Sequence, residues 1–153
     1  MAHVYISIGS NLEDPVAQVR RAVDALRAFG VVSAVSPFYK TKPWGTVQDQ
    51  PDFINAVVAL ETQLAPAELL LQLKAAERRL GRGSKPQRWG PRIIDFDILT
   101  FDRETIDESD LHIPHPRMNE RAFVLVPLAD LDRTFVPARD ALPEKERNSV
   151  TPL

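Results

Sequence analysis

Two aspartates, Asp95 and Asp97, stand close together in the apolar segment from Ile93 to Phe101. If this segment is a strand, its side chains point alternately to opposite faces, so both carboxylates share one face. At a rise of ~3.3 Å per residue, their Cα atoms lie roughly 6.5 Å apart. The ordinary interpretation is a pair of solvated acids on an edge strand. We favour a metal site, because charges among large apolar residues are costly unless they are paired. Oxygen ligands suit Mg²⁺ better than Zn²⁺.

A basic segment leads directly into this strand. Its cations, with no acidic residue among them, are Arg78, Arg79, Arg82, Lys85, Arg88 and Arg92. Cations near a helix C-terminus are favourable in any protein, which accounts for Arg78 and Arg79. The later cations lie beyond the helix, in a loop that contains glycine and proline. Arg92 comes just before Asp95, and a guanidinium beside paired carboxylates suits a ligand that carries phosphate.

Other side chains indicate a second part of the ligand. Phe53 and Asn55 share one face of a predicted strand, where an aromatic plane beside an amide could hold a flat heterocycle. The alternative is an ordinary aromatic in a partly covered sheet, and Phe123 is equally well a core residue or the other wall of the slot. His115 lies between two prolines, which fix its backbone direction. A lone histidine in a loop nevertheless has a structural role more often than a functional one.

Bulk composition narrows the class of protein. A chain of 153 residues with 44% apolar and 26% charged residues suits a single domain with its own core. The net charge of −2 gives no general attraction to nucleic acid or anionic membranes, so phosphate binding needs a local basic cluster. The absence of cysteine excludes disulfides and thiol chemistry and fits a reducing cytoplasm. With no signal peptide and no apolar run of ~20 residues, we expect a cytoplasmic monomer that acts on small molecules.

Hydrophobic periodicity predicts the elements that must position these residues. We expect strands at 3–9, 31–39, 53–61 and 93–101, and helices that open at Pro15 and Pro66 and stop at Gly30 and Gly81. This βαββαβ order predicts an α+β, ferredoxin-like fold, an antiparallel sheet with both helices on one face. A short hairpin over 102–111, a further apolar segment over 123–128 and a peripheral tail over 138–153 would form a C-terminal extension of the single domain, 1–153.

Strand parity assigns side chains to the two faces of this sheet. The face under the helices should hold Val4, Ile6, Ile8, Ile54, Ala56, Val58, Leu60, Ile94, Phe96 and Ile98. The opposite face should hold Tyr5, Ser7, Phe53, Asn55, Asp95 and Asp97. Because the polar candidates all fall on this second face, we expect a wet, site-bearing surface there. The long loops and the chain after residue 101 would form its roof.

Several blocks of sequence, taken in order, resemble one known family. They are Ile8-Gly9-Ser10-Asn11-Leu12, Ser36-Pro37-Phe38-Tyr39-Lys40-Thr41, Gln50-Pro51-Asp52-Phe53-Ile54-Asn55-Ala56, Glu77, the Arg-Trp-Gly-Pro-Arg-x-x-Asp-x-Asp-Ile-Leu run that ends at Leu99, and Pro114-His115-Pro116-Arg117. The chain is similar over most of its length to 6-hydroxymethyl-7,8-dihydropterin pyrophosphokinases of the folate pathway. The resemblance implies transfer of a pyrophosphoryl group from ATP to the hydroxymethyl oxygen of a reduced pterin, with release of AMP.

The resemblance also implies a role for each matching residue. Asp95 and Asp97 would hold two Mg²⁺ ions that bridge ATP and the pterin hydroxyl. The residues implied to clamp phosphates are Arg82, Arg92, His115 and Arg121. Those implied to bind the pterin are Asn55 at its edge, Thr41, Pro43 and Gly45 along its slot, and Phe53 and Phe123 on its ring. Glu77, Trp89 and Ile98 would border the nucleotide. The chain departs from the family pattern at Lys74, Ser84 and Phe96, so contacts from the first two positions are not implied.

Two other functions fit parts of the sequence. A ferredoxin-like RNA-binding module would need aromatic residues on a basic sheet face, and Asp95 and Asp97 would make that face negative. A metal-dependent nucleotidyltransferase could use the same pair of aspartates. Release of AMP would distinguish a pyrophosphokinase from that second enzyme, which releases pyrophosphate.

Overall fold

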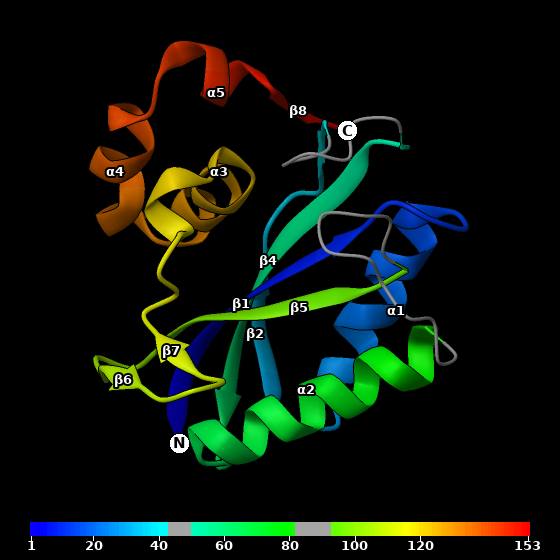
Figure 1. Ribbon diagram of the computed structural model, residues 1–153, viewed down its shortest axis with the longest axis vertical. Coiled ribbons are helices and arrows are strands. Elements are labelled where there is room, and N and C mark those ends of the chain that lie inside the picture. The colour runs from blue at the N-terminus through cyan, green and yellow to red at the C-terminus, as the bar shows by residue number, and fades with distance from the viewer. Residues whose placement is uncertain (43–49, 82–92) are drawn as a thin grey trace.

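An antiparallel sheet forms the centre of the computed structural model, which describes residues 1–42, 50–81 and 93–153 (Figure 1). Within these residues its strands are β1 (Ala2–Ser10), β2 (Val31–Val35), β3 (Tyr39–Thr41), β4 (Phe53–Thr62), β5 (Asp95–Phe101) and β8 (Val150–Pro152). The order is β5-β1-β4-β3-β8, and β2 also pairs with β4. The long strands β1 and β4 pair along their whole length, from Ala2 opposite Thr62 to Ser10 opposite Ile54. An antiparallel sheet was predicted; its ferredoxin-like classification stays a prediction.

Two helices, α1 (Pro15–Leu26) and α2 (Pro66–Gly81), cover one face of the sheet, as the sequence predicted. The Asp14 carboxylate caps α1 by accepting a hydrogen bond from the backbone N–H of Ala17, at 3.4 Å. The apolar stripes of both helices pack on every residue that parity assigned to this face, from Val4 to Ile98. Burial of each large aliphatic side chain stabilises the fold by roughly 1.5–3 kcal/mol.

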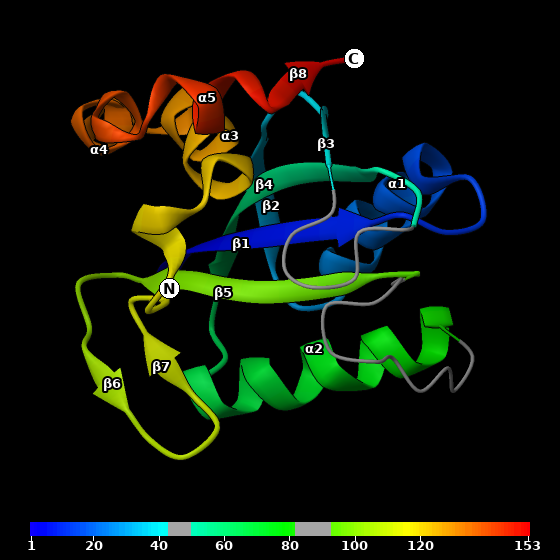
Figure 2. The same ribbon diagram turned by 45° about the horizontal axis from the view of Figure 1, so that its top comes forward.

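A third helix, α3 (Ala122–Leu131), covers part of the opposite face, where we expected a wet surface roofed by the long loops and the chain after residue 101. Its side chains form a second core with Tyr5, Val57, Ala59 and Leu99. Figure 2 shows α3 on the other side of the sheet from α2. The expectation of a uniformly wet face was therefore wrong for this half. Residues 122–128 are apolar all round, so they carry no stripe that would distinguish a helix from a strand.

The expected strand over 31–39 is divided into β2 and β3. The interruption contains Pro37, which has no N–H to donate and restricts the backbone of Ser36. Ser36 still contacts the sheet, because the backbone N–H of Val57 donates to its Oγ at 2.9 Å. Both pieces pair with β4.

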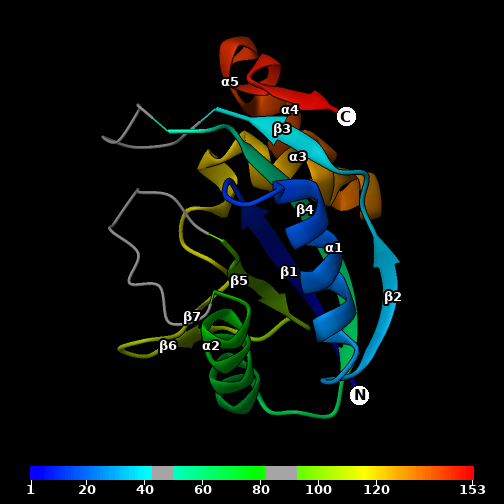
Figure 3. The same cartoon turned by 90° about the vertical axis from the view of Figure 1, so that its right-hand side faces the viewer.

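The remaining elements form the C-terminal extension. They are β6 (Ile106–Asp107) and β7 (His112–Ile113), which pair as a hairpin, followed by η1 (Met118–Glu120), η2 (Arg133–Phe135), α4 (Val136–Ala141) and α5 (Glu144–Asn148). The expected tail ends in β8, which pairs with β3 at the edge of the main sheet (Figure 3). Leu142 and Val150 of this tail are buried. Among the described residues, no helix combines the length and the apolar composition that crossing a bilayer requires.

Candidate active site

One row of residues crosses four strands on the face of the sheet that α3 partly covers. Tyr39 of β3 lies opposite Asn55 of β4, Asn55 lies opposite Gly9 of β1, and Gly9 lies opposite Asp95 of β5. Directly opposite residues of a sheet point to the same face. Asn55 and Asp95 therefore share a face, as predicted.

Gly9 leaves room in this row. A Cβ at that position would lie 3.0 Å from Asn55 Oδ1 and 3.7 Å from Phe53 Cδ1, so both side chains lean over β1. From the sequence, no role was expected for Gly9. A glycine inside a strand often marks the close approach of other groups, and this was the available signal.

A second row places Asp97 beside Ser7 of β1, and Ser7 in turn lies opposite Val57 of β4. Asp95 and Asp97 thus point to the same face of β5, which confirms the geometry on which the predicted metal site depends. Across this face, His115 Nε2 lies 3.8 Å from an Asp97 carboxylate oxygen.

The His115 ring is held in one orientation. Its backbone N–H donates to the Leu99 carbonyl at 2.8 Å, and its Nδ1 accepts a hydrogen bond from the backbone N–H of Arg117 at 3.2 Å. In neutral His115 the remaining hydrogen is therefore on Nε2, which faces Asp97. Burial lowers the pKa of His115, and Asp97 opposes this shift while Arg121 adds to it. The neutral form is accordingly favoured until more negative charge arrives.

Arg121 is a cationic residue on the same side of the site as His115. Its guanidinium lies 5.6 Å from the centre of the Phe123 ring, within range of a cation–π contact. Its Nε is buried and has no hydrogen-bond partner among the described residues. Burial lowers the pKa of Arg121, while Asp97 and Asp95 raise it. A buried donor without a partner is costly, so this N–H is available to an anionic ligand.

The predicted pterin slot is partly assembled. Asn55 is 4% exposed and Thr41 is also 4% exposed, and Asn55 Nδ2 donates to Thr41 Oγ1 at 2.6 Å. This bond leaves Asn55 Oδ1 on the side of Gly9. Phe53 lies on the same strand face, whereas Phe123 belongs to α3 and packs against the second core.

Glu77 contacts the strand that carries the aspartates. Its Oε2 accepts a hydrogen bond from the backbone N–H of Phe96 at 2.8 Å, and its Oε1 lies 3.6 Å from Lys74 Nζ. Because β5 is at the edge of the sheet, this amide would otherwise have no strand partner. Ile98, a second residue expected at the nucleotide, is 5% exposed and lies in the core under α1 and α2. Its side chain is therefore not placed to border a ligand on the opposite face.

Some predicted site residues lie outside the described part of the chain. They are Pro43, Gly45, Arg82, Trp89 and Arg92. Their roles remain predictions.

The donor set fits Mg²⁺ bound together with a ligand. No three His, Asp or Glu side chains converge on one point within residues 1–42, 50–81 and 93–153. Asp95 and Asp97 alone supply only part of an octahedral sphere. Mg²⁺ is commonly held by one or two carboxylates, with phosphate oxygens and water completing its coordination.

Paired acids on a sheet face, with a partly buried arginine across from them, are the arrangement expected of an α+β protein that binds phosphate with metal. Comparison with known proteins then specifies the family. Residues 5–133 match the family described as 7,8-dihydro-6-hydroxymethylpterin-pyrophosphokinase (HPPK), and the chain belongs to this family.

Individual relatives agree with this assignment. A protein of Pseudomonas aeruginosa is 48% identical over 130 residues, which cover 84% of this chain and 79% of the relative. A protein of Aquifex aeolicus is 36% identical over 156 residues, which cover 100% of this chain and 96% of the relative. Both are named 2-amino-4-hydroxy-6-hydroxymethyldihydropteridine pyrophosphokinase.

Solved structures share the fold. The chain is similar to the wild-type HPPK-DHPS of Plasmodium falciparum crystallised with pteroate, with a TM-score of 0.68 and 16% identity. A second HPPK-DHPS structure, in complex with substrates, gives a TM-score of 0.67 at 15% identity. The matches cover 84% and 85% of this chain but only 40% of each of those longer chains.

Proposed function

We propose that this pyrophosphokinase transfers the terminal pyrophosphoryl group of ATP to the hydroxymethyl oxygen of 6-hydroxymethyl-7,8-dihydropterin, releasing AMP, in folate biosynthesis. Family membership supports the reaction class. The observation that carries the proposal for this chain is the shared sheet face, with Asp95 and Asp97 on β5 and Asn55 two strands away on β4. A polyphosphate at the aspartates and a heterocycle at the amide would then be neighbours.

At the phosphate end, the chain supplies alignment and charge. Asp95 and Asp97 would hold Mg²⁺, two ions by the family likeness, and the bound metal would neutralise phosphate charge. Arg121 would donate its free Nε–H to a phosphate oxygen. His115 would donate from Nε2, and a nearby phosphate would favour its charged form. Transfer of this kind requires positioning and electrostatic stabilisation more than a covalent nucleophile.

At the pterin end, the chain supplies a polar edge and an aromatic wall. Thr41 engages the amide nitrogen of Asn55, which leaves Oδ1 to accept a hydrogen bond from a pterin ring N–H or amino group. Phe53 would stack on one side of the ring and Phe123 on the other. Pro43 and Gly45 would complete the slot. By the family likeness, Arg82 and Arg92 would clamp phosphates of ATP and Trp89 would border the nucleotide, and exclusion of water would protect the transfer.

The products of the reaction test this proposal. The protein is incubated with ATP and 6-hydroxymethyl-7,8-dihydropterin, with Mg²⁺ or with excess chelator, and AMP and free pyrophosphate are quantified separately. We expect AMP and a pyrophosphorylated pterin in equal amounts, only when Mg²⁺ is present. Release of free pyrophosphate with a nucleotidylated pterin would indicate a nucleotidyltransferase and contradict the proposal. A cytoplasmic monomer without nucleic-acid or membrane partners is part of the same proposal, and sedimentation of the purified chain tests its oligomeric state.

A further inference from the structure

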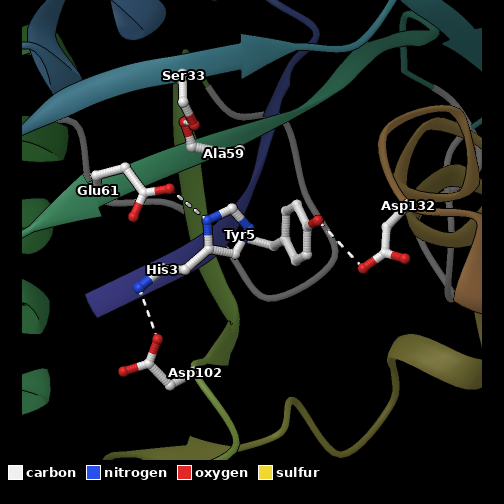
Figure 4. A network of polar contacts seen from close by, with 7 residues as sticks. All are labelled: His3, Tyr5, Ser33, Ala59, Glu61, Asp102 and Asp132. Atoms are coloured by element: carbon white, nitrogen blue, oxygen red, sulfur yellow. Dashed lines mark hydrogen bonds and ion pairs between the residues drawn. The ribbon is translucent and has the colours of Figure 1, made fainter. Parts of the chain in front are cut away.

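The C-terminal end of α3 is attached to the sheet by a tyrosine of β1. Tyr5 donates from its hydroxyl to Asp132 Oδ2 at 3.1 Å (Figure 4). The other carboxylate oxygen of Asp132 accepts from the backbone N–H of Thr134 at 3.0 Å and from its hydroxyl at 2.7 Å. The carboxylate is thereby oriented before Tyr5 contacts it. The Tyr5 ring is also fixed, since His3 and Phe135 both meet it edge-on, with centroid distances of 4.8 and 6.3 Å.

A tyrosine of β3 attaches the same end of α3 at a second point. Tyr39 donates from its hydroxyl to Asp130 Oδ2. Tyr39 also lies directly opposite Asn55, so the ring that holds the helix stands beside the amide of the proposed pterin slot. Both tyrosines are buried residues of the second core, and the hydroxyl of each reaches a carboxylate.

The other end of α3 begins at the site. Arg121 immediately precedes the helix, and Phe123 lies in its first turn. A helix of 10 residues is about 15 Å long. The carboxylates that bind the tyrosines therefore lie at the C-terminal end of α3, and Arg121 and Phe123 lie at its N-terminal end. The packing between them consists of apolar side chains such as Leu125 and Leu128, which attract without direction. Hydrogen bonds are directional, so the two tyrosine contacts add a constraint on the rotation and axial position of the helix that this packing does not supply.

We propose that Tyr5 and Tyr39 are positioning residues, whose hydroxyls hold Asp132 and Asp130 so that α3 presents Arg121 and Phe123 correctly to the two substrates. This inference rests on the proposed function for the roles of Arg121 and Phe123. Hydrogen bonds to charged groups are stronger than neutral ones, which suits them to fixing one arrangement. Each hydroxyl engages a carboxylate at the C-terminal end of α3, so its expected effect on the site runs through the helix.

Tyr5→Phe combined with Tyr39→Phe provides the test, because it removes both hydroxyls and keeps both rings. We expect kcat/KM to fall at least about tenfold, since small misplacements of site groups reduce rates strongly. The double substitution Tyr5→Phe/Tyr39→Phe is then added to a protein that already carries Arg121→Ala and Phe123→Ala. There it should lower kcat/KM less than about twofold, because the side chains that the tyrosines position are gone. An equal loss in both backgrounds would overturn the proposal.

A second pair of variants and a control separate positioning from stability. Asp130→Asn with Asp132→Asn removes both charged acceptors, and at Asp132 leaves one oxygen for the donors of Tyr5 and Thr134, so kcat/KM should fall as it does in the tyrosine pair. Val23→Ala removes methyl groups from the core on the other face of the sheet and should lower the melting temperature without lowering kcat/KM of the folded enzyme. If Val23→Ala reduced kcat/KM as much as the tyrosine pair does, the loss would reflect stability and the proposal would be wrong.

A readout that does not require activity keeps this proposal distinct from the proposed function. The buried Nε–H of Arg121 should give an ordered ¹⁵N–¹H resonance, assigned by its loss in Arg121→Lys. We expect it to shift or broaden in Tyr5→Phe/Tyr39→Phe and to remain unchanged in Val23→Ala. An unchanged resonance in the tyrosine variant would overturn the positioning role, even in an active enzyme. A shifted resonance would support it, even if no AMP were formed.

Discussion

Asp97 lies where charge, metal and phosphate chemistry would meet. It shares its sheet face with Asp95 and lies within ion-pair distance of His115. Asp97→Asn keeps the shape of the side chain and removes its charge. We expect kcat with Mg²⁺ to fall by at least about 100-fold, because an anionic ligand of the metal that would neutralise the reacting phosphates is lost.

The melting temperature of Asp97→Asn distinguishes a role in catalysis from a role in the fold. Removing one of two like charges from the same strand face should leave the melting temperature of Asp97→Asn unchanged or raise it. A variant that unfolded at a much lower temperature would mean that Asp97 has a structural role. One that kept near-normal kcat would contradict the metal site.

The two tyrosine hydroxyls give a second prediction at this scale. Burial, together with Asp132 for Tyr5 and Asp130 for Tyr39, raises the pKa of each to about 12. The chain contains only 2 tyrosines, so absorbance at 295 nm during alkaline titration reports these two alone. We expect little tyrosinate at pH 10.5 in the folded protein and a majority of tyrosinate at the same pH in urea, where the pKa is about 10.

The sign of the stability change follows from the same shift. The folded pKa lies above the unfolded one, so this contribution is fully present below pH about 10 and is lost as the pH rises through about 12. The free energy of unfolding should therefore decline across this interval. The Tyr5→Phe/Tyr39→Phe variant should decline less. Equal decline in both proteins would mean that other groups dominate.

Residue placement on the strands could be predicted because side chains alternate. Asp95, Asp97, Phe53 and Asn55 share a face for that reason alone. The contact of Arg121 with Phe123 and the free Nε could not be predicted, because they depend on a helix that the pattern does not reveal. Ile98 was expected at the nucleotide through family likeness, although its own parity already indicated the core.

At the scale of the elements, Glu77 connects α2 with the edge strand β5. Its carboxylate accepts the Phe96 N–H, which lies between the two aspartates along the chain. Glu77→Ala leaves this amide without its acceptor, and we expect a loss of about 1–3 kcal/mol in the free energy of unfolding, measured by chemical denaturation. Glu77→Gln retains an acceptor oxygen and should be affected much less. If both variants changed only KM for ATP, Glu77 would contact the nucleotide and have no part in holding β5.

The helices α1 and α2 could be predicted, whereas α3 could not. The first two have amphipathic stripes with proline at or near the start and glycine near the end. The third has Pro127 in its interior and apolar residues on nearly every side, because it is buried between the sheet and the C-terminal segments. Hydrophobic periodicity therefore does not predict α3, the helix that begins directly after Arg121.

At the scale of the whole molecule, the site is completed by segments far apart in sequence. Strand β3 carries Thr41, which holds Asn55, and β3 pairs on its outer side with β8, with Thr41 opposite Val150. The C-terminal segment thus supports the strand that lines the proposed pterin slot. This long-range pairing has no local signal, since nothing in residues 150–152 specifies β3 as a partner.

Removal of the last four residues, 150–153, tests this support. The truncation exposes the outer edge of β3 and deletes Val150, which is 7% exposed. We expect the free energy of unfolding to fall by about 2–4 kcal/mol, from the lost apolar burial and the lost pairing. KM for the pterin should rise several-fold more than KM for ATP, because Thr41 and Asn55 line the proposed pterin slot, whereas Asp97 lies on β5 and Arg121 immediately precedes α3. Leu153→Ala is the matched control, because it shortens a side chain that is 65% exposed. It should change neither the free energy of unfolding nor either KM value. Equal increases in both KM values would show that β8 supports the fold in general, without a particular connection to the slot.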